Sequence, residues 1–195
     1  MVYPVRSPDK AERTTLAVIL LGLFGLPLLG LTMLGCESTP AREIAIDDPR
    51  LAEREGLLYL DDLPYSGQIV TLYPDRTIAR REGYRDGRRD DTAWVFGASG
   101  QLLEERVYRD GRKIARHRGW YEDGSRRFDY TFVDDRHEGS AREWYPDGRL
   151  YRNFTYVAGH EEGRQVMYDE AGIMRANYVV RNGRRYGSIG TKPCR

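Results

Sequence analysis

The chain repeats itself every 24 residues, and this period constrains its fold more than any other feature. Stepping by 24 from Tyr84 reaches another aromatic or apolar residue at every step through Val180. Self-similarity at a fixed interval indicates a repeat architecture, in which each unit buries its apolar side by stacking on its neighbours. We therefore predict one repeat domain over residues 55–187, with about five repeats. Four registers stay in phase: Gly67, Asp91, Ala115, Gly139, Gly163 and Gly187; Arg76, Gly100, Gly124, Gly148 and Gly172; Tyr84, Tyr108, Phe132, Tyr156 and Val180; Gly87, Gly111, Asp135, Gly159 and Gly183.

Each unit contains two turn signals. Asp-Gly and Asn-Gly between apolar runs favour tight hairpins, because both central residues of a type I′ turn need positive φ. The loops at 96–100 and 168–172 are predicted to be one residue longer than those at 121–124 and 145–148, and Arg76 and Asp135 stand where other copies have glycine. The predicted turn glycines are Gly87, Gly100, Gly111, Gly124, Gly148, Gly159, Gly172 and Gly183.

Between the turns, residues alternate with the period of two that a half-buried strand requires. In one strand Leu150, Phe154 and Tyr156 are predicted on one face, with Tyr151, Asn153 and Thr155 on the other. The predicted fold is all-β: an elongated, single-layer antiparallel β-meander of about ten strands joined by tight hairpins. Its apolar face carries an aromatic stripe of Tyr84, Tyr108, Tyr130, Phe132, Phe154, Tyr156 and Tyr178.

A glycine, then an aromatic residue, then aromatic-x-Asp-Gly, as in Gly139, Trp144 and Tyr145-Pro-Asp-Gly148, resembles the bacterial variant of the MORN repeat. The lead-in Glu55-Gly-Leu-Leu-Tyr59 resembles the segment that opens such arrays. This variant is grouped with the YwqK-type proteins labelled as antitoxins. The resemblance covers Glu55 to Gly187, and it implies an open, twisted antiparallel sheet without an enclosed active site.

Residues 1–35 have the features of an export signal. Arg6, Lys10 and Arg13 precede an uncharged apolar run from Thr14 to Gly35, and Cys36 follows at once. The Gly35-Cys36 junction resembles a lipobox, which implies lipidation of Cys36, although Met33 and Leu34 depart from the usual pattern. The run is also long enough to span a bilayer as an uncleaved anchor. Both interpretations place the repeats at the cell envelope, facing the periplasm or the exterior, because the basic residues stay inside.

The rest of the chain has balanced charge. Residues 36–54 are predicted to be a polar tether with a short helix around 49–54, and 188–195 a C-terminal tail. After residue 35 the numbers of acidic and basic residues are equal, so neither a nucleic-acid partner nor a polybasic membrane sensor is expected. Lipidation of Cys36 would leave Cys194 single, and a disulfide between the two is not expected.

No pattern of catalytic residues stands out. His117, His137 and His160 lack metal-ligand spacing, the Asp residues of the turns are explained by turn geometry, and the glycines recur as turns rather than in a phosphate loop. The prediction is a non-enzymatic protein without cofactor or metal.

Two functional hypotheses follow from the predicted surface. The first is a protein-interaction module, with an antitoxin or immunity-type binder as one special case. The second is a structural envelope component that binds cell-wall glycan or lipid. For most of the aromatic stripe, burial by neighbouring side chains is favoured over recognition. The candidate partner-binding residues are Trp120, Tyr121, Trp144 and Tyr145, because Trp and Tyr dominate binding hot spots.

Overall fold

A computed structural model describes residues 42–188 of the chain. The predicted signal segment, Cys36 and Cys194 lie outside the described residues. Within residues 42–188 every regular element is a β-strand. No helix long and apolar enough to span a bilayer occurs in that part of the chain.

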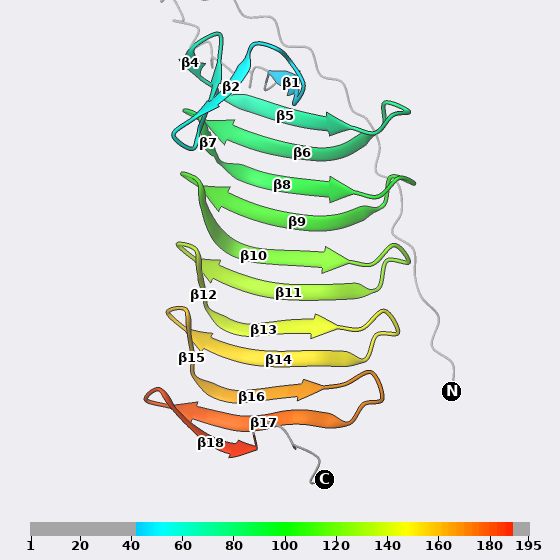
Figure 1. Ribbon diagram of the computed structural model, residues 1–195, viewed down its shortest axis with the longest axis vertical. Helices are drawn as coiled ribbons and strands as arrows, with labels where there is room; N and C mark the ends of the chain where they lie inside the picture. Colours follow the sequence, from blue (N-terminus) through cyan, green and yellow to red (C-terminus); the bar gives the residue numbers. More distant parts are fainter. Residues whose placement is uncertain (1–41, 189–195) are drawn as a thin grey trace, which may run out of the picture. The chain divides into compact units, whose positions relative to one another are not determined.

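Fifteen strands form one large sheet in the order β1-β5-β6-β8-β9-β10-β11-β13-β14-β16-β17-β18, and the short strands β7, β12 and β15 pair with β6, β11 and β14 (Figure 1). All pairings are antiparallel except the parallel pair β1–β5. The all-β, antiparallel hairpin prediction is therefore confirmed. The strands are β1 (Glu43–Ala45), β5 (Gly67–Leu72), β6 (Ile78–Arg85), β7 (Arg88–Arg89), β8 (Asp91–Phe96), β9 (Leu102–Arg109), β10 (Arg112–Trp120), β11 (Arg126–Val133), β12 (Arg136–His137), β13 (Gly139–Trp144), β14 (Leu150–Val157), β15 (His160–Glu161), β16 (Gly163–Tyr168), β17 (Met174–Arg181) and β18 (Arg184–Ser188).

The sheet has more strands than the ten expected, because the strand after most hairpin tips is divided by a bend. The chain turns at Asp91, Gly139 and Gly163, where φ is 76°, 71° and 78°. These bends separate β7, β12 and β15 from the strands that follow them. Ala115 has φ 56° at the corresponding place, and β10 continues through it with a shift of register against β9.

Two kinds of turn alternate along the sheet. The hairpin tips are two-residue turns with positive φ at both residues, for example 49° at Asp86 and 79° at Gly87. The loops at the other end share one pair of backbone hydrogen bonds. In the loop that begins at Tyr121, the Tyr121 amide donates to the carbonyl oxygen of Ser125, and the Gly124 amide donates to the carbonyl oxygen of Tyr121. The loops that begin at residues 97, 145 and 169 have the same two bonds. These loops have equal length, so the longer loops predicted at 96–100 and 168–172 are wrong. All eight predicted turn glycines have positive φ, and Arg76 adopts φ 70° in the first loop.

A β-bulge in each of these hairpins changes which residues share a face. Glu143 pairs with Arg152 and Trp144 with Leu150, so one extra residue, Tyr151, is accommodated between the pairs. Glu143 and Trp144 point to opposite faces because they are consecutive in a strand. The prediction that Leu150 shares a face with Phe154 is therefore wrong. Equivalent shifts follow Thr71, Val95, Gly119 and Met167.

The segment before the repeats is folded, contrary to the predicted tether and helix. Residues 43–45 form β1, which pairs along β5, and Leu51–Arg54 form strand β2 of a second sheet with β3 (Leu57–Leu60) and β4 (Leu63–Pro64). Leucine and isoleucine within 44–60 supply the apolar side that a tether would lack. Together with the first repeat strand they form a small core of Ile44, Leu58, Leu60, Tyr65 and Ile69.

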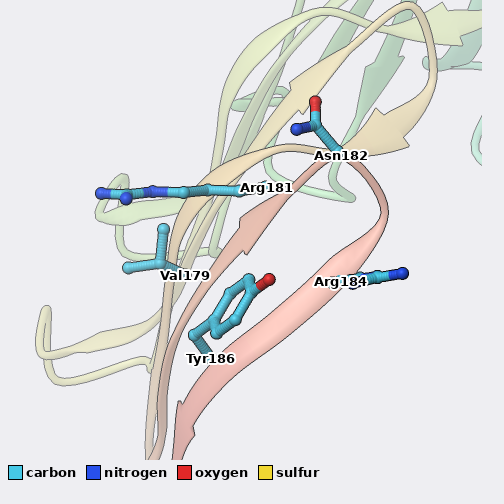
Figure 2. Close-up of a pocket in the computed structure, with 5 residues that line it drawn as sticks. All are labelled: Val179, Arg181, Asn182, Arg184 and Tyr186. Atoms are coloured by element: carbon cyan, nitrogen blue, oxygen red, sulfur yellow. The ribbon is translucent and has the colours of Figure 1, made fainter.

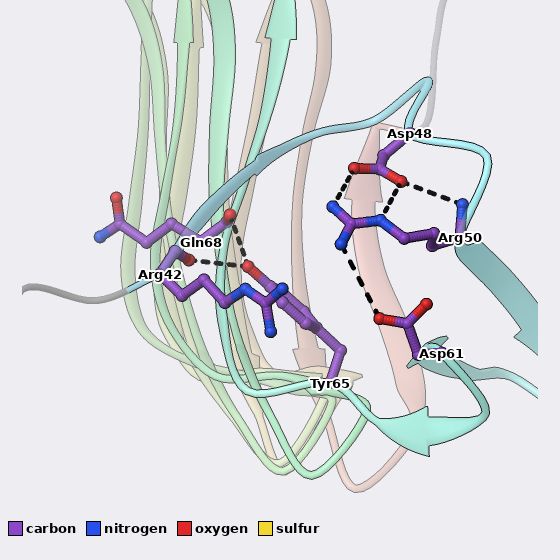
Figure 3. A network of polar contacts seen from close by, with 6 residues as sticks. All are labelled: Arg42, Asp48, Arg50, Asp61, Tyr65 and Gln68. Carbon is purple, nitrogen blue, oxygen red and sulfur yellow. Dashed lines mark hydrogen bonds and ion pairs between the residues drawn. The ribbon is translucent and has the colours of Figure 1, made fainter.

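Polar contacts fasten this N-terminal cap (Figure 3). The hydroxyl of Tyr65 lies 2.7 Å from the carbonyl oxygen of Arg42 and 2.9 Å from that of Gln68. Arg50 donates to Asp48 at 2.7 Å, and hydrogen bonds from Arg50 lower the pKa of Asp48 to about 2. Because β1 covers the outer side of β5, the first edge of the large sheet is partly protected from strand addition.

Candidate functional site

The predicted aromatic stripe lies on one face of the sheet, which we call the aromatic face. Tyr84, Tyr108, Phe132 and Tyr156 occupy the same register position in successive hairpins, so their side chains lie on the same face of the sheet. Tyr108, Phe132 and Tyr178 are buried.

Side chains from the hairpin tips cover these rings. The guanidinium of Arg89 lies 5.8 Å from the Tyr108 centroid, and the ammonium of Lys113 lies 5.3 Å from that of Phe132. His137 stacks on Tyr156 with ring centroids 5.0 Å apart. Each of the three covers an aromatic ring of the following hairpin, and for Arg89 and Lys113 the contact is the attraction of a cation to a ring face. The stripe is therefore mainly an internal packing surface.

A buried row runs beside the stripe. Two of its members are polar, and each forms hydrogen bonds with the backbone amide and carbonyl groups of one residue on the preceding strand of the sheet. The ring Nε2 of His117 lies 3.2 Å from the amide nitrogen and 2.9 Å from the carbonyl oxygen of Val107. Gln165 accepts from the Thr155 amide at 3.0 Å and donates to its carbonyl oxygen at 2.8 Å. The row consists of Ile69, Ala93, His117, Ala141 and Gln165.

His117 is buried and His137 is half-buried, and both have structural surroundings. Burial lowers the pKa of His117, and the nearby cations Arg106 and Lys113 lower it further. Burial also lowers the pKa of His137. Their neutral rings serve as packing and hydrogen-bonding groups.

The four predicted partner-binding residues do not form one patch. Trp120 lies on the face opposite the stripe, where the Arg118 guanidinium is 5.6 Å from its ring centroid, and Trp144 lies on that same face by strand alternation. Tyr121 and Tyr145 line a groove on the aromatic face, and Trp144 borders it as well, where its carbonyl oxygen accepts a hydrogen bond from Tyr121. Of the four, Trp120 does not line this groove.

The groove on the aromatic face is about 310 Å³ and is lined by tyrosines. The hydroxyl of Tyr121 donates to the carbonyl oxygen of Trp144 at 2.7 Å. Tyr145 packs on Tyr151 with centroids 5.1 Å apart. The groove is therefore preformed by hydrogen bonds and ring contacts.

A polar cluster forms the floor of this groove. Glu143 accepts hydrogen bonds from both Tyr130 and Arg152. Burial and the Glu143 carboxylate raise the pKa of Tyr130 well above its usual range. A carboxylate that is already paired with a cation and a phenol is a structural anchor rather than a free general base.

The opposite face carries a row of cross-strand pairs, apolar except for Arg126, which we call the opposite-face row. Each pair joins the last residue of one strand to the first residue of the next, beside the bulge. Apart from the two tryptophans, this row was missed because the face assignment ignored the bulge; stepping by 24 from Trp120 would have found most of it. The pairs are Leu72 with Ile78, Phe96 with Leu102, Trp120 with Arg126, Trp144 with Leu150, and Tyr168 with Met174.

Charged residues occupy the centre of the opposite face. Arg118 forms an ion pair with Glu105, and Arg116 with Asp129. Hydrogen bonding from Arg116 lowers the pKa of Asp129. Such pairs on an exposed sheet face contribute little stability each but keep the surface hydrated. The opposite-face row therefore forms an apolar strip beside a hydrated surface.

The carboxylates of the loops have local roles. Asp123 accepts from the amide of Ser125 at 2.8 Å, and Asp147 from that of Arg149 at 2.9 Å. Hydrogen bonds from the side chains of Ser125 and Arg149, together with these backbone bonds, lower the pKa of Asp123 and Asp147 respectively. Among residues 42–188, no three His, Cys, Asp or Glu side chains are grouped to hold a metal ion.

Comparisons with known proteins do not assign the chain. No family model matches it. No curated protein matches it either.

Proposed function

We propose that the chain is an envelope lipoprotein, anchored through Cys36, whose 24-residue MORN-type repeats bind a protein partner. The spacing of the strands supports the repeat unit: β6, β9, β11, β14 and β17 begin at Ile78, Leu102, Arg126, Leu150 and Met174. In this proposal the repeats form an elongated single-layer sheet, and capture is stoichiometric, without turnover. An antitoxin or immunity role against one toxin is a special case.

The observation that carries the proposal is the opposite-face row. Four aromatic residues of this row are the last residues of β8, β10, β13 and β16, and each is only half-buried. They are Phe96, Trp120, Trp144 and Tyr168. Strands are about 4.8 Å apart, so successive aromatic residues are spaced by roughly 10 Å. A line of large apolar side chains beside a charged surface has the composition of a protein-binding hot spot and its polar rim.

The aromatic stripe does not offer an equivalent surface. Its rings are buried under Arg89, Lys113 and His137, so a partner would have to displace these side chains first. In the opposite-face row such a contact is made to Trp120 by Arg118, whose guanidinium lies 5.6 Å from the ring centroid; among the described residues none is found for Phe96, Trp144 or Tyr168.

Site-specific photocrosslinking in the intact chain tests the proposal. A photoreactive residue replaces Trp144 in full-length protein in host membranes, and in a second sample it replaces Val157, which is 52% exposed but lies off the row. We expect one dominant protein adduct from position 144 and none from 157. The double variant W120S/W144S should lower co-purification of that protein at least ten-fold, whereas V133S/V157S should not.

Failure would take a clear form. Equal adducts from positions 144 and 157, or co-purification unchanged in W120S/W144S, would reject the row as the binding surface. The anchor is checked separately: Cys36→Ser should abolish incorporation of labelled lipid, and continued incorporation would reject Cys36 as the lipidated residue.

A further inference from the structure

The last hairpin of the sheet, β17–β18, carries an open hollow of about 780 Å³. Figure 2 shows five described residues that line it, and all five belong to this hairpin. They combine two arginines with an aromatic ring and a short apolar side chain: Val179, Arg181, Asn182, Arg184 and Tyr186.

The register places the two arginines directly opposite each other. Arg181 pairs with Arg184, and Val179 pairs with Tyr186. Like charges opposite each other on one sheet face destabilise the pairing. No ion pair joins either arginine to a carboxylate anywhere in residues 42–188. Figure 2 shows their guanidinium groups pointing in different directions, as repulsion favours.

Other hairpins of the sheet provide an internal comparison. Arg85 pairs with Arg88, and Arg109 with Arg112, at the same place relative to the tip. The turns also share their backbone, with φ of 49° at Asp86 and Asp110 and 51° at Asn182. Since all three residues adopt the same turn, the exchange of Asp for Asn changes charge but not geometry.

The earlier hairpins carry carboxylates beside their arginines, although of these four arginines only Arg85 forms an ion pair within residues 42–188. Asp86 and Asp110 lie at the tips, and Asp90 pairs with Arg85 at 3.0 Å. In the last hairpin the nearest acidic residue with a defined contact is Glu161, which bonds Arg185 and Tyr178 on the aromatic face. Within residues 42–188, the β17–β18 hairpin therefore has two arginines without an ion pair on the opposite face, and an asparagine rather than an aspartate at its tip.

Tyr186 gives the hollow a second recognition element. Its side chain is 55% exposed, and its cross-strand neighbour Val179 supports one side of the ring. An exposed aromatic ring packs well against the apolar C–H face of a sugar ring, while a guanidinium pairs with a carboxylate in a planar, bidentate way. Figure 2 shows Arg181 extending past Val179, on the side of the hairpin where the Tyr186 ring lies.

We propose that the β17–β18 hairpin binds an acidic saccharide of the uronic-acid class, with a sugar ring on Tyr186 and its carboxylate on Arg181. Arg184 adds positive charge that attracts the ligand. The site lies apart from the opposite-face row and does not depend on the proposed protein partner, so each can fail without the other.

Calorimetric titration of the full-length protein tests this site. The protein is held in a detergent without sugar headgroups, and the probes are tetragalacturonic acid, neutral maltotetraose and inorganic phosphate. We expect tetragalacturonic acid to bind with a Kd below about 1 mM at low salt, and the other two probes to bind at least ten-fold more weakly. Arg181→Gln and Tyr186→Ser should each weaken binding at least ten-fold.

Arg109→Gln is the matched control, since Arg109 occupies the equivalent place in an earlier hairpin and should leave binding unchanged. Equal weakening by R109Q would indicate diffuse attraction to the whole sheet and overturn the site. Equal affinity for maltotetraose or phosphate, or no binding of tetragalacturonic acid, would overturn the acidic-saccharide assignment. Unfolding temperatures of the three variants show whether each is folded, and both exposed substitutions should leave them within a few degrees of the parent.

Discussion

The hydroxyl of Tyr145 donates a hydrogen bond of 3.0 Å to the carbonyl oxygen of Tyr168, which lies 23 residues later in the chain. Tyr121 makes the same contact to Trp144 at 2.7 Å, and Tyr73 to Phe96 at 2.9 Å. Each bond joins the loop of one hairpin to the strand end of the next. Gly97 and Asp169 replace the tyrosine in the remaining loops, so this connection is present only where the loop begins with tyrosine.

Removing this hydroxyl tests how strongly it couples neighbouring hairpins. Tyr145→Phe should lower the free energy of unfolding by about 1 kcal/mol, because the carbonyl oxygen of Tyr168 loses its side-chain donor. Tyr151→Phe is the control, since no hydrogen bond of its hydroxyl is found among the described residues. Denaturant unfolding measures both; equal losses would mean that the Tyr145 bond contributes nothing specific.

His117 should make stability depend on pH. Its pKa is lowered in the folded state, so the unfolded chain takes up the proton first as pH falls. The free energy of unfolding should therefore decrease as pH drops below about 6.5, before the carboxylates titrate near pH 4. Gln165 makes equivalent contacts with an amide that does not titrate.

His117→Gln should consequently fold and lose part of this pH dependence. Unfolding curves between pH 5 and 8 measure the slope, and His160→Gln at an exposed hairpin tip is the control. Because the pKa of His137 is also lowered, some slope should remain in H117Q. A slope unchanged from the parent would show that His117 stays protonated to the same degree in both states.

Gly119 is required by a ring packed against its backbone. A Cβ atom at this position would lie 2.1 Å from the Phe128 ring, its cross-strand partner. Gly119→Ala should cost about 1–3 kcal/mol through overpacking. The double variant G119A/F128L should recover part of that loss, as thermal unfolding can measure; a strictly additive double variant would show that the ring is not the cause.

Deletion of one repeat tests the 24-residue unit directly. Removing residues 115–138 joins Ile114 to Gly139, which has the positive φ that Ala115 has. This variant should unfold cooperatively and keep its strand spectrum by circular dichroism. Removing 115–137 instead leaves one residue too many, which turns alternate side chains to the wrong face, and should give an unfolded or aggregating protein. Equal behaviour of both deletions would reject the unit.

The difference between the predicted and observed faces comes from a single inserted residue per hairpin. Tyr151 is the extra residue between the pairs Glu143–Arg152 and Trp144–Leu150. A strict period of two assigned Leu150 to the aromatic face, although it lies on the other. Bulges leave little trace in the local pattern, because the residues on either side still alternate.

The N-terminal cap shows a similar limit. Residues 43–54 are rich in charged side chains and contain Pro49, and Pro40 precedes them, so the composition favours a tether. Ile44 is nevertheless buried against Leu58, Leu60 and Ile69, contacts that cannot be anticipated without the pairing of β1 with β5.

The sequence alone determined the all-β class, the hairpin tips and the aromatic stripe, because turn residues and alternation act over a few neighbouring positions. Only the tertiary structure decided which surfaces are free. It covered rings of the stripe with Arg89, Lys113 and His137, placed Trp120 outside the groove that Tyr121 and Tyr145 line, and left Arg181 and Arg184 without a carboxylate partner among the described residues. Those outcomes depend on cross-strand partners far apart in the chain, which local patterns do not contain.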